Sequence, residues 1–141
     1  MTDITTVARA AHEAGADAVS LINTVVGLVV DWRRRRPVLA NDIGGLSGPA
    51  IKPIALRMVW QVHRALPDLP LIGIGGICSA DDALEFLVAG ASAVQVGTAT
   101  FADPSLADRL IDELPRKLAQ VGVSDVNSFI GTLQSNKSSP T

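Results

Sequence analysis

Hydrophobic positions along the chain follow two patterns that alternate with one another. Four segments carry apolar residues at spacings of three and four, which predict helices over residues 3–14, 49–66, 79–89 and 103–121. Three short apolar runs bounded by glycine or proline predict strands over residues 17–22, 71–74 and 93–96. Alternating strands and helices are typical of a parallel sheet wrapped by helices, so we predict an α/β fold.

Local signals bound the third predicted helix. Ser79 precedes Asp82 by three residues, which is the spacing of a capping box, and Gly90 stands where a helix-ending glycine is expected. Residues 14–21 and 89–96 are similar to one another, and each combines a helix end, a glycine and a strand. This internal repeat of an αβ unit supports a parallel, helix-wrapped sheet.

Glycines end two successive predicted strands. Gly75 and Gly76 follow one strand, and Gly97 follows the next. Because glycine has no side chain, backbone N–H groups there can approach an anion, and the last strands of β/α barrels often hold a phosphate in this way. The alternative is that these glycines only make tight turns. A closed barrel has eight strands and usually about 250 residues, so this chain is expected to supply about three βα units of an incomplete barrel.

A long excursion separates the first predicted strand from the second helix. Residues 28–31 and 38–41 are expected to pair as a small hairpin around residues 32–37. The run Arg33–Arg36 carries four positive charges. It is either a solvated loop tip or a docking patch for an acidic partner.

Three expectations concern the last third of the chain. Pro115 lies inside the fourth predicted helix, which it is expected to kink or split. Residues 124–130 are expected to form one more helical turn. Residues 134–141 are polar, and we expect a disordered tail over residues 132–141 after a single domain, a partial barrel, over residues 1–131.

Composition narrows the classes of function. With 4% aromatic residues, no tyrosine and a net charge of −2, the chain has neither stacking platforms nor a general attraction for nucleic acid. A single cysteine excludes an intrachain disulfide and an all-cysteine metal site. No apolar run reaches membrane-spanning length, and a signal-peptide pattern is missing, so we expect a cytoplasmic protein that binds no membrane.

Five motifs resemble those of the dihydroorotate dehydrogenase family, most closely its NAD-linked class 1B catalytic subunits. They are Asn23-Thr24, Pro37-Val-Leu-Ala-Asn41, Gly44-Gly-Leu-Ser-Gly-Pro-Ala-Ile-Lys-Pro53, Gly75-Gly-Ile77 and Gly97-Thr98. The resemblance extends over about residues 2–131 and matches the carboxyl-terminal part of a flavin-binding (β/α)8 TIM barrel, so the domain over residues 1–131 is expected to be a partial flavin-binding barrel. It implies oxidation of dihydroorotate to orotate in pyrimidine biosynthesis, with a hydride passing to a flavin and a proton to a general base.

The resemblance also implies roles for particular residues. Those expected to contact flavin mononucleotide (FMN) are Ile22, Gly48, Gly75, Gly76, Gly97 and Thr98, the last four around its phosphate. Asn23 and Thr24 are expected to hold the substrate, since a carboxamide can both donate to and accept from orotate. The alternative for Asn23 is a turn-capping residue at a strand end.

Parts of the family's machinery have no counterpart here. Its catalytic cysteine and a flavin-contacting lysine lie upstream of the matched region, and Cys78 is better interpreted as a small, semi-buried residue. We therefore expect no catalytic residue and no metal ligand, and inactivity of the chain alone. Class 1B implies a homo-oligomer and a separate electron-transfer subunit that carries FAD and an iron–sulfur cluster.

Two other hypotheses stay open. The chain is either a non-enzymatic remnant or assembly module that needs a partner, or part of a barrel like that of dihydropyrimidine dehydrogenase. The continuation Ala50-Ile-Lys-Pro53 is more similar to the dihydroorotate enzymes.

Overall fold

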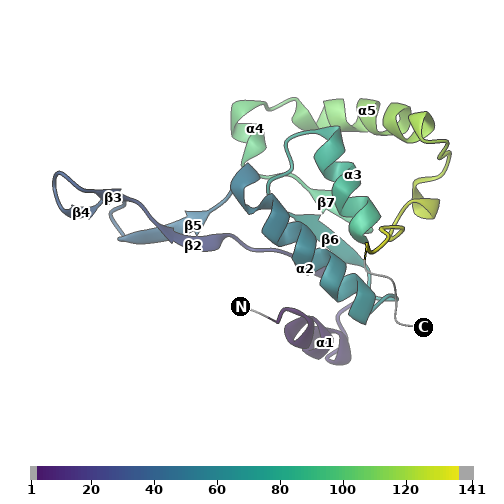
Figure 1. Cartoon of the computed structure of the whole chain (residues 1–141), viewed down its shortest axis with the longest axis horizontal. Helices are drawn as coiled ribbons and strands as arrows, with labels where there is room; N and C mark the ends of the chain where they lie inside the picture. Colours follow the sequence, from purple (N-terminus) through teal and green to yellow (C-terminus); the bar gives the residue numbers. More distant parts are fainter. Residues whose placement is uncertain (1–2, 137–141) are drawn as a thin grey trace.

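Three parallel strands form the centre of the fold in the computed structural model, which describes residues 3–136. Strand β6 (Leu71–Ile74) lies between β1 (Val19–Leu21) and β7 (Ala93–Gln95) (Figure 1). In register, Leu21 lies opposite Gly73, which in turn lies opposite Val94. The mixed α/β architecture with a parallel sheet, predicted from alternating periodicities, is confirmed.

Helices pack on one face of this sheet (Figure 1). Those that pack on the strands are α1 (Thr5–Glu13), α2 (Lys52–Ala65), which follows the 3₁₀ turn η1 (Pro49–Ile51), and α3 (Ala80–Ala89). Helix α5 (Leu106–Gln120) packs on α3, and the short α4 (Ala99–Ala102) packs on α5. The core lies between helices and sheet, and its largest fully buried side chains are Phe86, Leu71, Val59 and Val62. Alternate strand residues such as Ser20, Ala93 and Gln95 are exposed on the opposite sheet face.

The predicted internal repeat has matching backbone geometry in its two copies. Gly15 and Gly90 follow α1 and α3 with φ of +95° and +117°. In each copy the next amide, of Ala16 or Ala91, donates to the carbonyl five residues earlier at 3.0 Å. This is the hydrogen bond of a Schellman motif. The strands that follow, β1 and β7, flank β6 on either side.

The excursion forms a long two-part hairpin that projects away from the body (Figure 1). Strand β2 (Val25–Leu28) pairs with β5 (Ile43–Leu46), and β3 (Val30–Asp31) pairs with β4 (Arg36–Pro37). The expected hairpin is present, but its second arm was wrongly predicted over residues 38–41. That segment turns instead, because Asp42 has a φ of +63° and the Ile43 amide donates to the Asn41 carbonyl at 2.7 Å.

The last third of the chain corrects two expectations. Helix α5 begins at Leu106 rather than at residue 103, and it continues through Pro115 without being split. Proline removes one backbone hydrogen bond, but buried Leu110 and Leu118 hold the helix against the core on both sides of it. The expected additional turn is η2 (Val126–Ser128).

The chain after η2 returns to α3. The amides of Gly131 and Leu133 donate to the carbonyls of Leu87 and Val88 at 3.0 Å. Residues 137–141 of the expected disordered tail lie outside the described residues.

Candidate ligand site at the carboxyl edge of the sheet

A cavity of about 450 Å³ lies where the three parallel strands end. Its walls come from the segments that follow β1, β6 and β7 and from the turn before α2. All eight residues that the sequence predicted to bind ligand line it: Ile22, Asn23, Thr24, Gly48, Gly75, Gly76, Gly97 and Thr98. The structure thus brings together residues that are far apart in the chain, while their individual roles stay predictions.

The Gly75–Gly76 turn requires glycine for steric reasons. The two residues have φ of +132° and +75°, a backbone region that other residues rarely adopt. A β carbon on Gly76 would lie 2.8 Å from the Gly48 carbonyl oxygen and 2.9 Å from the Lys52 β carbon. At these two positions the tight-turn interpretation is sufficient to explain the residue type.

Gly97 differs from the preceding pair. It does not have a positive φ, and a β carbon built on it would meet no heavy atom of the described chain within 4 Å. The fold therefore does not require glycine at this position. Gly97 nevertheless lines the cavity, beside Thr98.

Backbone amides are the main unused donors of the cavity. Within residues 3–136, the N–H groups of Gly76, Ile77, Gly97 and Thr98 donate no hydrogen bond to another residue. All four residues line the cavity, and they come from the segments that follow β6 and β7. Free backbone N–H groups gathered in one concavity are typical of anion sites, so this part of the cavity is a candidate site for a phosphate.

A hydroxyl pair joins the two sides of the cavity. Thr98 Oγ1 donates to Ser47 Oγ at 2.8 Å, which connects the segment after β7 to the turn that precedes η1. The sequence did not single out Ser47, and its one signal was its place inside the glycine-rich motif before the second helix.

Asn23 has the capping contacts that the sequence offered as one alternative, while its substrate-binding role stays a prediction. Its Oδ1 accepts the Thr24 amide at 2.7 Å and the Thr24 hydroxyl at 3.4 Å, so the oxygen has the local capping role. The Asn23 carboxamide nitrogen donates no hydrogen bond to the described chain, although the residue lines the cavity. That nitrogen is available to a ligand acceptor.

An ion-pair network lies behind the glycine turn, outside the cavity. Lys52 Nζ, at the start of α2, lies 2.5 Å from Asp82 Oδ1 and 2.9 Å from Glu85 Oε2. Asp82 Oδ2 accepts the Cys78 amide and the Ser79 hydroxyl, both at 2.9 Å. The Asp82 amide donates to Ser79 Oγ at 3.2 Å, which confirms Ser79 as the predicted N-cap, while the carboxylate reaches back to the Cys78 amide, one residue before the cap.

Electrostatics favour the charged forms of this network. Burial of the Asp82 carboxyl would raise its pKa, but the hydrogen bond from Lys52 and those from the loop donors outweigh burial and lower the pKa below the ordinary 3.8. The hydrogen bonds that Lys52 donates to Asp82 and Glu85 raise the pKa of the ammonium above the ordinary 10.5. Sequence reasoning missed this pair because its members lie 30 residues apart.

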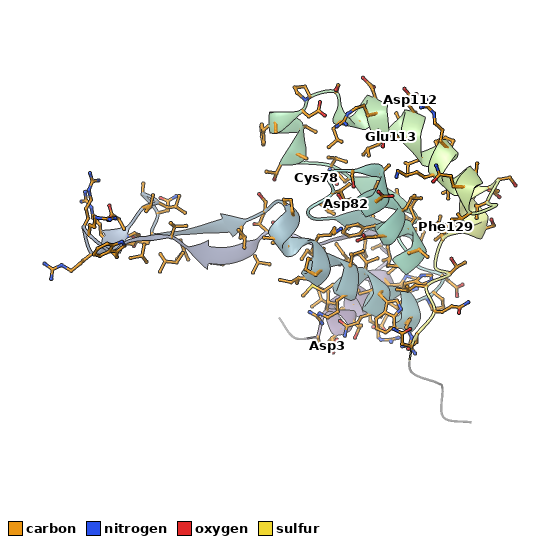
Figure 2. All side chains as sticks on the ribbon, turned by 45° about the horizontal axis from the view of Figure 1, so that its top comes forward. Asp3, Cys78, Asp82, Asp112, Glu113 and Phe129 are labelled. Carbon is orange, nitrogen blue, oxygen red and sulfur yellow. The ribbon has the colours of Figure 1, made fainter. Side chains whose placement is uncertain are left out.

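Three other lining side chains extend the site. Ser20 and Gln95 lie on the exposed face of the sheet, where alternation along a strand gave no reason to separate them from ordinary solvent-facing residues. Cys78 is half-buried at the cavity wall, close to Asp82 (Figure 2). Among residues 3–136, no group of three or more His, Cys, Asp or Glu side chains could hold a metal ion.

Fold and site define a class: an α/β protein with a parallel sheet whose glycine-rich carboxyl edge suits a phosphorylated ligand. The family model described as Dihydroorotate dehydrogenase matches residues 1–118, and the chain belongs to this family.

Similar proteins are dihydroorotate dehydrogenase B (NAD(+)) catalytic subunits. The protein of Geobacter sp. (strain M21) is 60% identical over 134 residues, which cover 95% of this chain and 44% of that relative. Those of Trichlorobacter lovleyi and Citrifermentans bemidjiense are 59% and 60% identical over the same shares. The chain therefore spans less than half the length of these relatives. In the described part of the chain, no helix has the length and apolar character to cross a bilayer.

Proposed function

We propose that this chain is the FMN- and orotate-binding part of a dihydroorotate dehydrogenase that oxidises dihydroorotate in pyrimidine biosynthesis. The observation that carries the proposal is the meeting of unused backbone amides on both sides of one cavity, beside a glycine that the fold itself does not need. Family membership supports the same interpretation.

The residues present fit the cofactor. The amides of Gly76, Ile77, Gly97 and Thr98 would hold the FMN phosphate, and Ile22 with Gly48 would line the path of the rest of the molecule. The cavity of about 450 Å³ is open enough to admit a cofactor of this kind. When bound, FMN supplies the hydride-accepting ring system.

The chain's own residues would bind and orient the substrate. Asn23 Nδ2 would donate to an orotate oxygen while its Oδ1 keeps the local bond to Thr24, and the Thr24 hydroxyl would provide a second contact. We assign no residue of this chain as the general base, and we propose that the chain is inactive until another polypeptide supplies one.

The sheet supports an incomplete barrel. Side chains on the exposed sheet face form two rows, one of Ser20, Ile72 and Ala93 and one of Ile74 and Gln95, which resemble successive layers of a barrel interior. Within residues 3–136, β1 and β7 pair only with β6, so both sheet edges are open. In the complete cytoplasmic assembly we expect a homo-oligomer and an electron-transfer subunit that carries FAD and an iron–sulfur cluster.

One observation favours a second candidate, an assembly module without activity of its own. Open edges and exposed apolar hairpin residues, such as Val26, Leu28 and Val30, would be covered by a partner. A chain that melts cooperatively as a monodisperse monomer would contradict this candidate.

Flavin titration tests the first proposal. Binding of FMN, monitored by quenching of its fluorescence, is expected to be tighter than binding of riboflavin, which lacks the phosphate. Equal affinity for the two flavins, or no binding of either, would contradict the phosphate site.

An activity assay tests the proposed inactivity. Mixing the chain with dihydroorotate and a dye acceptor should give no turnover, and turnover by this chain alone would refute the proposed inactivity. Preference for uracil over orotate would favour the dihydropyrimidine dehydrogenase alternative.

A further inference from the structure

Lys52 and Asp82 lie outside the cavity, yet they hold the loop that forms one of its walls. Figure 2 shows Asp82 near the start of α3, next to Cys78 on the preceding loop. Asp82 uses both carboxylate oxygens: Oδ1 lies 2.5 Å from Lys52 Nζ, and Oδ2 accepts the Cys78 amide at 2.9 Å. A single side chain therefore ties the end of the glycine loop to the beginning of α2.

The beginning of the loop is fixed by contact with the same lysine. A β carbon on Gly76 would lie 2.9 Å from the Lys52 β carbon and 2.8 Å from the Gly48 carbonyl oxygen, so Gly76 packs directly on these two residues. Lys52 is itself restrained, because its ammonium contacts Asp82 and Glu85. The short segment between the two anchors contains the unused amides of Gly76 and Ile77.

The backbone amides of the loop that follows β6 differ in whether they have a hydrogen-bond partner. The Cys78 amide is committed to the Asp82 carboxylate behind the loop, whereas those of Gly76 and Ile77 have no partner in the described chain. A carboxylate so close to an anion site would repel a phosphate if its charge were uncompensated. Here the Lys52 ammonium and the loop donors compensate it.

We propose that Lys52 and Asp82 are positioning residues for the phosphate of FMN: they hold the Gly76 and Ile77 amides in place without touching the ligand. This inference rests on the proposed function. A donor array that is fixed before binding loses less free energy on binding than a mobile one. Breaking the pair should therefore weaken recognition of the phosphate and leave the contacts to the flavin ring unchanged.

A comparison of FMN with riboflavin tests the inference in the full chain. Asp82→Asn is expected to reduce FMN affinity about tenfold, which corresponds to a charged hydrogen bond, and to leave riboflavin affinity unchanged. Asp81→Asn is the matched control, because Asp81 lies in the same first turn of α3, is 70% exposed and pairs with Lys117 at 2.9 Å. It removes the same charge from the same helix end, and both affinities should stay at their original values.

Other outcomes are equally informative. Equal losses for FMN and riboflavin in Asp82→Asn, or an unchanged preference for FMN, would overturn the positioning role and leave the proposed function intact. A wild-type chain without any preference for FMN would overturn the proposed function and this inference with it.

Lys52→Met is a second, independent variant. It breaks the ion pair but keeps the capping contacts of Asp82. It therefore tests the positioning role even if Asp82→Asn fails to fold in a circular-dichroism melt. It should lower the preference for FMN over riboflavin, whereas Lys117→Met should not. In the double variant Asp82→Asn/Lys52→Met, the loss of FMN affinity should be no larger than that of the more damaging single substitution, because the two residues act as a unit. Additive losses would contradict the proposal.

Discussion

At the scale of single residues, the glycines of the site differ in whether the fold itself requires glycine at their positions. Gly75 and Gly76 are required by backbone conformation, and Gly76 is also required by its close packing on Lys52 and Gly48. Gly97 has neither constraint, since its φ is not positive and a β carbon built on it would meet nothing within 4 Å in the described chain, although the residue lines the cavity. Stability and binding should therefore respond differently to the same substitution at these positions.

Gly97→Ala is expected to change the free energy of unfolding by less than about 0.5 kcal/mol. The same methyl group should reduce FMN affinity about tenfold, because it would keep a phosphate from approaching the backbone amides of Gly97 and Thr98 closely. Gly76→Ala should instead destabilise the chain by about 2 kcal/mol or more, because of its φ of +75° and its contact with the Gly48 carbonyl. Chemical denaturation and flavin titration measure the two effects. If Gly97→Ala were as destabilising as Gly76→Ala, Gly97 would be a turn residue only.

The Asp82 carboxylate gives stability a specific dependence on pH. Its pKa in the folded chain lies below the ordinary 3.8, so its contribution is present above about pH 4 and is lost as the pH falls through the folded value. Asp82→Asn should therefore flatten the acid limb of a plot of unfolding free energy against pH. Exposed carboxyls such as Asp3 titrate in both proteins and cancel in the comparison. Identical acid limbs would show that the ion pair does not contribute to stability.

At the scale of elements, strand β6 and helix α3 were predicted to within a residue because their signals are local. Pro70 and Gly75 bound the strand, and Ser79 and Gly90 bound the helix. The hairpin was predicted less well because strand register depends on which residues pair across the turn, which a run of apolar residues does not specify. Helix α5 passes through Pro115 because tertiary packing overrides a local preference.

The two copies of the αβ repeat allow two contributions to the free energy of unfolding to be measured separately: backbone strain at positive φ, and overpacking by an added β carbon. Gly15 and Gly90 both have positive φ, but a β carbon on Gly15 meets nothing within 4 Å in the described chain, whereas one on Gly90 would lie 2.2 Å from His63 Cγ. Gly15→Ala should cost about 1 kcal/mol, the conformational strain alone. Gly90→Ala should cost about 3 kcal/mol, since displacement of the imidazole adds overpacking. Thermal unfolding of both variants measures the difference, and equal costs would mean that His63 moves aside freely.

At the scale of the whole molecule, a rule about parallel sheets predicted the meeting of three of the four segments that line the cavity, whereas Gly48 in the fourth was expected only from the family resemblance. Carboxyl ends of parallel strands share an edge, so the motifs after β1, β6 and β7 were expected to converge. Ser47, Gln95 and the Lys52–Asp82 pair could not be found in this way, because side-chain contacts across long sequence separations depend on packing. The same topology leaves one sheet face and two edges uncovered in the described chain.

The uncovered sheet face and its open edges lead to a prediction about assembly. The part of the Geobacter sp. relative outside the matched 134 residues should bind this chain when the two are coexpressed, since it would supply further strands to the open edges. Binding of a partner to the folded state raises apparent stability, so the melting temperature of the chain should increase by about 5 °C or more. Ala93→Arg places a charge on the exposed sheet face and should abolish the increase. Ala119→Arg, on the exposed surface of α5, should preserve it. If both arginine variants behaved alike, or if the partner failed to raise the melting temperature, this sheet face would not be the interior of a shared barrel. We expect the assembled pair to turn over dihydroorotate. Loss of turnover in Asn23→Ala with assembly unchanged would then support the substrate contact proposed for Asn23, separately from completion of the barrel.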